Sequence, residues 1–541
     1  MKPQAPRKGI PPRAAAWLLL ALVLLFNFAV RWHLRELPLE RDEGEYAYAG
    51  QLILQGVPPY QLVWNMKFPG TYYAYAGLMA VFGQSAAGIH LGLILVTSLS
   101  ILLMFFIGRK VLNEAGGVMA AALFAALSAH PYANGLAGHA THFVVLFACL
   151  ATYALLRQSE KDATAWKFLA GASLGLAILM KQHAAVFALA GIIWMAWEKR
   201  SHPRQLLVSL GILGGGLAAP IGLVFAGLAW AGVWQRFHFW TIEYARQYVS
   251  FFPLRLAPEY FAAGFMPIFT NGIWVWPLGL AGLALLFLRT PFRRAAMLGA
   301  GLLLAGLLAT VPGFYFRGHY FLMVMPGIAL LNAALILALA GWVKKFPDLR
   351  WLRFLAPCLL VVVLADLGLR NARLWFALPP PEVSRLLYHY NPFPESPAIA
   401  AYLAAHTAPS DTIAVLGSEP QLYFLSGRRP ATGYIYMYPL TEPQALAARM
   451  REEFTHEIEQ ARPKYVVHIN IFASWCSAVI PGVTGPTIDR LENWWAGYAS
   501  SYQLVGIVDM TDGQPTRFFW DSQLASRTNT NPANITIFVR Q

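Results

Sequence analysis

Charged residues are what this sequence lacks most. Only 13% of its 541 residues are Asp, Glu, Lys or Arg, whereas soluble globular proteins carry about 25%. A surface that faces water on all sides cannot be built from so few charges, so a soluble enzyme is excluded. The chain is also 57% hydrophobic, which excludes a disordered protein because disorder requires low hydrophobicity.

Cysteine is the second scarce residue, with Cys149, Cys358 and Cys476 alone. Only Cys476 lies beyond residue 371, so a disulfide framework within the C-terminal part of the chain is excluded. That part must therefore be held together by a hydrophobic core of its own.

Acidic residues are the scarcer charge, with 27 Asp and Glu against 41 Lys and Arg. Residues 1–371 contain 29 of the cations and 13 of the acids, so the whole basic excess lies in this apolar part. Its cations fall between long uncharged runs, and about 20 apolar residues span a bilayer as a helix. The sequence predicts a polytopic α-helical membrane protein, with the lipid bilayer as a partner and no nucleic acid.

We predict eleven transmembrane helices, and the charges between them predict their orientation. The spans are approximately 14–33, 86–108, 115–133, 139–157, 165–181, 183–198, 205–231, 271–288, 295–313, 319–342 and 352–371. Connections on one side carry 19 cations and those on the other side carry 10, so the positive-inside rule makes the first side cytoplasmic. The first span lacks a cleavage site after it and is expected to be a retained anchor. We expect a plasma (inner) membrane protein with a cytoplasmic N-terminus.

The predicted organisation has three parts. Residues 1–371 form the transmembrane module, whose first external loop covers 34–85, and residues 372–397 form a proline-rich linker. Residues 398–541 form an extracytoplasmic α/β domain, since predicted strands alternate there with predicted helices. The strands are 412–416, 464–469, 503–508 and 535–539, and the helices are 398–406 and 441–462. This domain is expected to bind the acceptor or cover the cavity.

The first external loop concentrates the acids. Five of the eight acids expected to face outward in residues 1–371 fall within 36–45. Two tyrosine-rich amphipathic stretches follow, 46–56 and 71–82, which suit helices lying in the membrane interface. A carboxylate pair with one lysine suits deprotonation of a hydroxyl beside an anionic group. The alternative interpretation is a solvated loop without a chemical role.

Three short motifs in this loop carry a family resemblance. They are Asp42-Glu43-Gly44-x-Tyr46, Gly56-x-Pro58-Pro59-Tyr60 and Lys67-x-Pro69-Gly70. The pattern resembles the membrane-embedded C-type glycosyltransferase superfamily, in particular the group of protein O-mannosyltransferases and lipid A aminoarabinose transferases. Residues 314–326 and 415–430 extend the resemblance less specifically.

This resemblance implies a C-type glycosyltransferase fold that moves a sugar from a polyprenyl-phosphate donor to a hydroxyl of a lipid, glycan or protein acceptor on the extracytoplasmic face. It implies that Asp42 is the base and that Lys67 lies near the donor phosphate, with Glu43 orienting or binding the acceptor. Transfer with one base and no carboxylate nucleophile is inverting. The rival interpretation is a non-enzymatic membrane transporter or lipid-binding scaffold, and a third is transfer of a whole oligosaccharide.

Further candidates lie near the outer ends of spans. Arg317, His319, Tyr320 and Lys181 are predicted to bind the donor phosphate, for which the arginine fork is well suited. An aromatic-belt anchor with a snorkelling arginine explains the first three equally well. The residues predicted to line the substrate cavity are Tyr46, Tyr60, His139, His142, Tyr244 and Arg246.

No cofactor or metal is expected. Metal-dependent members of the family use acids between their third and fourth spans, and residues 130–142 contain none. A divalent metal stays an alternative, because His139 and His142 could bind a softer ion.

Overall fold

The computed structural model describes residues 12–343, 345, 354–476, 484–511 and 514–541. The chain forms two compact units, each assembled from three stretches of sequence. Unit 1 contains residues 1–34, 90–223 and 254–378, and unit 2 contains residues 35–89, 224–253 and 379–541. Outside the described residues lie Lys2, Arg7 and Lys8, which precede the first predicted span. The predicted beginning of the last span lies outside them as well.

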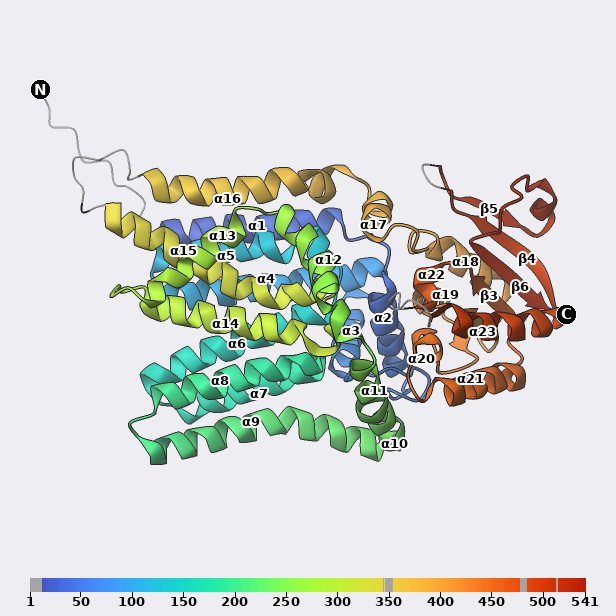
Figure 1. Ribbon diagram of the computed structural model, residues 1–541, viewed down its shortest axis with the longest axis horizontal. Coiled ribbons are helices and arrows are strands. Elements are labelled where there is room, and N and C mark those ends of the chain that lie inside the picture. The colour runs from blue at the N-terminus through green and yellow to red at the C-terminus, as the bar shows by residue number, and fades with distance from the viewer. Residues whose placement is uncertain (1–11, 344, 346–353, 477–483, 512–513) are drawn as a thin grey trace, which may run out of the picture. The chain divides into compact units, whose positions relative to one another are not determined.

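Unit 1 is helical, and most of its helices run side by side (Figure 1). Its helices are α1 (Pro12–His33), α4 (Ala86–Val111), α5 (Glu114–Ser128), α6 (Ala140–Lys161), α7 (Thr164–Met180), α8 (Ala185–Glu198), α9 (Pro203–Trp230), α12 (Ala257–Thr270), α13 (Val275–Ala281), α14 (Arg293–Thr310), α15 (Met325–Val343) and α16 (Leu355–Ala372). Short helical turns join them, including η1 (Pro131–Ala133), η2 (Gln182–Ala184), η5 (Gly282–Leu286), η7 (Gly318–Val324) and η9 (Arg373–Ala377). The first residues of α4 and the last of α9 belong to unit 2.

Among the described residues, seven helices are long and apolar enough to cross a membrane, or eight with one bent pair. Three further predicted spans fall on the shorter helices α5, α7 and α8, and α7 and α8 are separate helices joined by η2. Each of the eleven predicted spans therefore overlaps a helix, and the chain is a multi-pass membrane protein. The exact number of spans stays a prediction.

One predicted span is wrong in form. We expected a single helix over 271–288, but α12 and α13 meet there at a bend of 100°. Asn271 caps α12, and residues 271–274 form a turn before α13 begins. The turn begins with Asn271-Gly272, a dipeptide typical of turns, which averaged hydropathy does not reveal. Residues 234–270, expected as a loop, are also largely helical.

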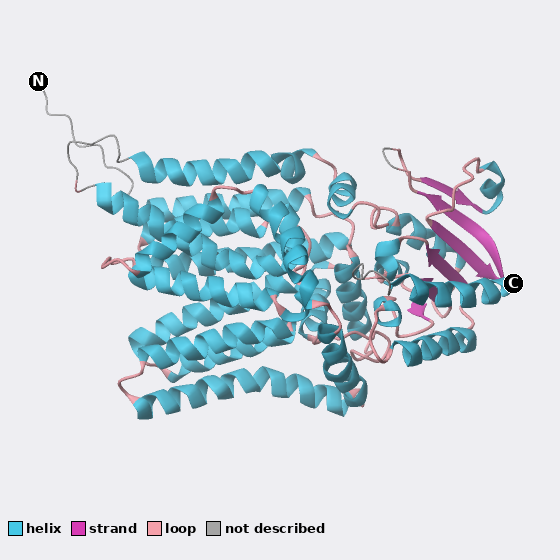
Figure 2. Ribbon diagram, viewed as in Figure 1, coloured by secondary structure: helices cyan, strands magenta, loops and turns pink. Residues whose placement is uncertain are grey.

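Unit 2 contains a six-stranded mixed sheet with the order β2-β1-β3-β6-β4-β5 (Figure 2). Its strands are β1 (Thr412–Leu416), β2 (Arg429–Pro430), β3 (Tyr465–Ile469), β4 (Tyr502–Asp509), β5 (Arg517–Trp520) and β6 (Ile535–Arg540). β1 pairs in parallel with β2 and β3, and the remaining pairs are antiparallel. The four predicted strands agree with β1, β3, β4 and β6 to within one residue. Two strands were not predicted, because β2 has two residues and β5 is only half-buried.

The helices of unit 2 come from all three of its stretches. They are α2 (Arg41–Leu54), α3 (Gly70–Phe82), α10 (Trp234–His238), the π-helix η3 (Phe239–Tyr244), α11 (Ala245–Ser250), α17 (Pro380–Tyr388), α18 (Ser396–His406), α19 (Gln421–Ser426), α20 (Tyr438–Thr441), α21 (Ala447–Ala461), α22 (Phe472–Trp475) and α23 (Thr484–Tyr498). The helix predicted at 441–462 corresponds to α21, which is shorter because it begins at Ala447, after Pro443. The first external loop thus folds together with the C-terminal residues in one unit.

Candidate active site

Helix α2 begins inside the acidic stretch, five residues earlier than the sequence predicted. Glu40 is its N-cap and forms a capping box with Glu43: the Glu43 N–H donates to Glu40 Oε1 at 2.8 Å, and the Glu40 N–H donates to Glu43 Oε2 at 3.4 Å. Asp42 and Glu43 occupy the first turn, where the helix dipole stabilises negative charge. The acids therefore stand at an ordered helix end, and the buried Glu43 carboxylate takes part in the cap.

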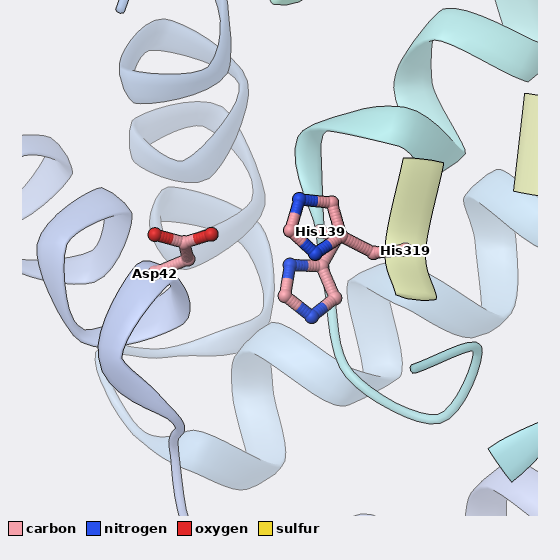
Figure 3. A group of neighbouring side chains, drawn as sticks. All are labelled: Asp42, His139 and His319. Carbon is pink, nitrogen blue, oxygen red and sulfur yellow. The ribbon is translucent and has the colours of Figure 1, made fainter. Parts of the chain in front are cut away.

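Asp42 and Glu45 lie about one turn apart on α2, and both contact Lys67. Lys67 Nζ is 2.7 Å from Asp42 Oδ1 and 2.5 Å from Glu45 Oε2. The exposed fraction of the side chain is 23% for Asp42, 19% for Lys67 and 0% for Glu45. Asp42, drawn on the first turn of α2 in Figure 3, is the accessible carboxylate of the pair, and Glu45 is the buried one.

The position of Lys67 is fixed by the loop before α3. Tyr60 has a positive φ of 65° and donates its hydroxyl to the Lys67 carbonyl at 2.7 Å. The Tyr60 ring is completely buried, in a cluster with Val233 and Phe237. Pro69 then caps α3. A buried tyrosine and a proline thus place the lysine backbone, while the ion pairs with Asp42 and Glu45 hold its ammonium group.

Burial and charge shift the pKa values of this cluster in opposite directions. Burial raises the pKa of Glu45, while the Lys67 ammonium lowers it and the Asp42 carboxylate raises it further. Burial alone would lower the pKa of Lys67, but Asp42 and Glu45 raise it well above its ordinary value. Burial also raises the pKa of Tyr72, whose hydroxyl donates to Glu45 Oε1. Lys67 therefore stays charged at physiological pH, and one ammonium serves two acids.

Residues far along the chain complete the surroundings of Asp42. The Tyr436 hydroxyl lies 3.2 Å from Asp42 Oδ1 and 3.0 Å from the Arg41 carbonyl oxygen. The Arg41 side chain pairs with the buried Glu419, with Nη2 2.7 Å from Oε1. Arg41 Nη2 also donates to Asn391 Oδ1 at 3.0 Å. The C-terminal residues thus hold both Asp42 and its neighbour.

Unit 1 brings together four of the predicted residues in pairs. The His139 and His319 rings stack with centroids 4.2 Å apart at 7°, one above the other in Figure 3. Lys181 Nζ lies 4.3 Å from the centroid of the Tyr320 ring, a distance typical of a cation–π contact. Arg317 lies over the Tyr315 ring at 5.4 Å.

The remaining predicted residues lie partly in the cluster formed by Asp42, Glu45 and Lys67 and partly elsewhere. Tyr46 belongs to the cluster, since Lys67 Nζ lies 4.7 Å from its ring centroid. His142 Nε2 is 3.1 Å from the Gly135 carbonyl oxygen. Tyr244 donates to Glu442 at 3.2 Å in a separate part of unit 2, and Arg246 is exposed on α11.

Sequence reasoning missed Glu45, Tyr72 and Tyr436. Glu45 could have been found, because its spacing of three from Asp42 places both acids on one face of a helix. Tyr72 and Tyr436 carry no such signal: one is among many tyrosines, and the other is almost 400 residues from Asp42.

Chemically, the cluster offers a partly exposed carboxylate held by a lysine and a tyrosine. Such a group can accept a proton from a hydroxyl that approaches α2. The buried Glu45 and Glu43 are engaged in the ion pair and the cap.

The chain is similar to known proteins in sequence and in fold. Residues 67–230 match the family described as dolichyl-phosphate-mannose-protein mannosyltransferase. The chain is similar to the undecaprenyl phosphate-alpha-4-amino-4-deoxy-L-arabinose arabinosyl transferase of Pseudomonas aeruginosa, with 28% identity over 259 residues. This alignment covers 44% of the chain and 45% of that relative, so the chain matches less than half of the relative's length.

Two solved structures share the fold. ArnT from Cupriavidus metallidurans, bound to undecaprenyl phosphate, aligns with a TM-score of 0.54 at 17% identity, over 84% of this chain and 93% of that one. The oligosaccharyltransferase AglB from Archaeoglobus fulgidus, in complex with an inhibitory peptide and a dolichol-phosphate, aligns with a TM-score of 0.50 at 13% identity, over 96% and 75%.

The class that these matches define is that of the membrane-embedded C-type glycosyltransferases. The chain has their fold, and the resemblance to the mannosyltransferase and aminoarabinose transferase group that the first-loop motifs predicted is confirmed.

Proposed function

We propose that this protein is an integral-membrane glycosyltransferase. It moves a sugar from a polyprenyl-phosphate donor to a hydroxyl of a lipid, glycan or protein acceptor at the extracytoplasmic face of the plasma (inner) membrane. The observation that carries the proposal is the partly exposed carboxylate of Asp42. Asp42 lies on the first turn of α2, and its Oδ1 is 2.7 Å from Lys67 Nζ. The relative's name, which refers to an undecaprenyl phosphate sugar, and the lipid phosphates bound in both solved structures support the donor class.

In the proposed reaction, Asp42 accepts the proton of the acceptor hydroxyl. The hydroxyl oxygen then forms a bond to the anomeric carbon as the bond from that carbon to the phosphate oxygen breaks, and the polyprenyl phosphate departs with both electrons. Attack opposite the leaving group inverts the anomeric centre, and no carboxylate nucleophile is required. Glu43 supports the end of α2 that presents the base.

The departing phosphate needs cations, and we assign this role to Lys181 and Arg317, together with His319 and Tyr320. Preorganised cations stabilise the charge that develops on a leaving phosphate. We expected Lys67 there as well. Since its ammonium is paired with Asp42 and Glu45, we assign Lys67 to orienting the base.

The proposed orientation places the N-terminus in the cytoplasm and the sheet of unit 2 outside it, after eleven spans. The reaction is proposed to need no divalent metal, because residues 130–142 contain no acid. Carboxylates are the usual ligands of hard divalent ions such as Mg²⁺ and Mn²⁺.

The test is transfer by the purified full-length protein in proteoliposomes containing undecaprenyl-phosphate monosaccharides labelled in the sugar. Membrane lipid and protein extracts serve as acceptors, and parallel reactions contain EDTA. We expect Asp42→Asn to abolish transfer, since the amide cannot act as a base, whereas EDTA leaves the wild-type rate unchanged. Asp411→Asn removes a surface carboxylate paired with Lys464 and serves as the matched control.

Two results would count against the proposal. A folded Asp42→Asn variant with the wild-type rate removes Asp42 as the base. Wild-type protein that binds these donors without turnover favours the transporter or scaffold instead.

A further inference from the structure

The hydroxyl of Tyr436, in the C-terminal part of unit 2, contacts Asp42 in the first external loop. We propose that Tyr436 is a positioning residue for Asp42, and that its hydroxyl orients the Asp42 carboxylate and weakens its hold on the proton. The inference rests on the proposed function in that Asp42 is the base, and it makes the C-terminal part of unit 2 a component of the reaction centre.

The Tyr436 hydroxyl lies within hydrogen-bond distance of Asp42. It is 3.2 Å from Asp42 Oδ1 and 3.0 Å from the Arg41 carbonyl. A phenol carries one proton, and an ionised carboxylate is the stronger acceptor of the two. Burial and the nearby Asp42 raise the pKa of Tyr436 well above its ordinary value, so the phenol keeps its proton and remains a donor.

The backbone next to Tyr436 is held through Ser418. The Met437 N–H donates to Ser418 Oγ at 2.9 Å, and the Ser418 N–H donates to Ser474 Oγ at 2.8 Å. The Ser418 carbonyl in turn accepts from Arg41. The irregular segment that carries Tyr436 is therefore tied, through Ser418, to Arg41, the residue next to Asp42.

Two glycines allow the first external loop and residues 418–438 to approach each other closely. A Cβ at Gly44 would lie 2.6 Å from the Gln421 backbone nitrogen, and a Cβ at Gly433 would lie 2.3 Å from the Trp64 ring. The backbone N–H of Trp64 also donates to the Gly433 carbonyl at 3.0 Å. The first loop and residues 418–438 thus fit together with no room for adjustment, and the phenol is brought to Asp42 by backbone contacts on either side.

Lys67 donates to the same Asp42 oxygen as Tyr436, but its ammonium is shared with a second acid. It divides its charge between Asp42 and Glu45, at 2.7 Å and 2.5 Å. The Tyr436 hydroxyl is directed to Asp42 and the Arg41 carbonyl instead. A donor that favours the ionised form of a carboxyl group makes that group more acidic, so the Tyr436 hydroxyl stabilises the ionised form of Asp42, the form that can accept a proton.

The experiment compares Tyr436→Phe with wild type in the proteoliposome assay, with the full-length protein. We expect kcat to fall roughly ten- to a hundredfold, as for loss of one hydrogen bond to a charged group. The KM for the donor should change by less than about twofold, because Tyr436 does not contact it. The acidic limb of the pH–rate profile should move to higher pH, since the ionised form of Asp42 has lost a donor.

Tyr502→Phe is the matched control. Its hydroxyl donates to the Pro463 carbonyl at 2.9 Å, and both residues lie in the C-terminal part of unit 2, away from Asp42 in sequence. It also loses one buried hydroxyl, so it reports any general cost of the substitution. Its kcat and pH profile should equal those of wild type, and thermal unfolding in detergent verifies that both variants are folded.

A Tyr436→Phe variant with wild-type kcat and an unshifted acidic limb overturns the inference, and so does a change in KM alone. A second readout does not depend on turnover. The infrared carboxyl band that is absent from Asp42→Asn should titrate at higher pH in Tyr436→Phe than in wild type. If wild-type protein transfers no sugar, the proposed function fails, whereas this titration still decides the role of Tyr436.

Discussion

Lys67 illustrates how one residue acquires its role from its partners. Its ammonium contacts two carboxylates, one partly exposed and one completely buried. Desolvation of Glu45 is costly, and the ion pair offsets it only while the cation is present. Lys67 thus stabilises the fold of the loop as well as the ionised form of Asp42.

We predict that Lys67→Met destabilises the protein by about 3–5 kcal/mol at pH 7.5, because it leaves a buried acid unpaired. Adding Glu45→Gln to the same chain should recover part of this loss, since only one carboxylate then remains to be compensated. Chemical unfolding in detergent measures both. Lys464→Met, which removes a surface lysine paired with Asp411, should match wild type.

The pH dependence has a defined sign. The carboxylates raise the folded-state pKa of Lys67, so its contribution is fully present below its unfolded pKa and is lost only as pH rises through the folded value. In Lys67→Met the loss of stability relative to wild type should shrink as pH falls, because the buried Glu45, whose pKa is raised, takes up a proton and no longer needs a cation. Equal stability of Lys67→Met and wild type at pH 7.5 would contradict this account.

At the scale of elements, α2 and α19 depend on one glycine. Glycine inside a helix costs about 0.5–1 kcal/mol relative to alanine, so Gly44 needs a reason. The reason is that a Cβ there would lie 2.6 Å from the Gln421 nitrogen and 2.7 Å from the Gln421 Cβ. The two helices approach at this point more closely than any side chain permits.

We therefore predict that Gly44→Ala separates α2 from α19 and destabilises the protein by about 1–3 kcal/mol through overpacking. Transfer should fall too, since Asp42 moves relative to Tyr436. Gly77→Ala is the control: Gly77 lies in α3, and a Cβ added there would have nothing within 4 Å, so the helix should gain stability. A Gly44→Ala protein as stable and active as wild type would show that the contact is not constraining.

At the scale of the whole molecule, the distribution of charge predicts the orientation of the protein in the membrane. The cations gather in alternate connections of the membrane part, and retention of Lys and Arg in the cytoplasm is what directs insertion. The scarce acids instead gather at the start of α2, where one short segment holds both the N-cap Glu40 and the proposed base Asp42.

Cysteine labelling in intact cells tests this orientation. With Cys149, Cys358 and Cys476 replaced by alanine, Gln460→Cys at the end of α21 should react with a membrane-impermeant maleimide. Ser201→Cys, in the cation-rich connection between α8 and α9, should react only after the cells are lysed. Both positions are exposed. The reverse pattern would place the sheet in the cytoplasm.

The sequence by itself determined the membrane class, the position of most helices, four of the strands and the importance of residues 36–45. These features follow from hydropathy, charge and short motifs, which are local properties of the chain. The sequence also indicated Asp42 and Lys67 through a motif, although their roles in the reaction stay predictions.

Only the tertiary structure decided what surrounds them. It showed Glu45 as the second partner of Lys67, Glu43 in the helix cap and the 100° bend between α12 and α13. It also brought Tyr436 to Asp42 across almost 400 residues. Contacts of this kind arise when backbones pack closely at Gly44 and Gly433, and no periodicity or composition records them, because the free energy that selects them belongs to the packed fold.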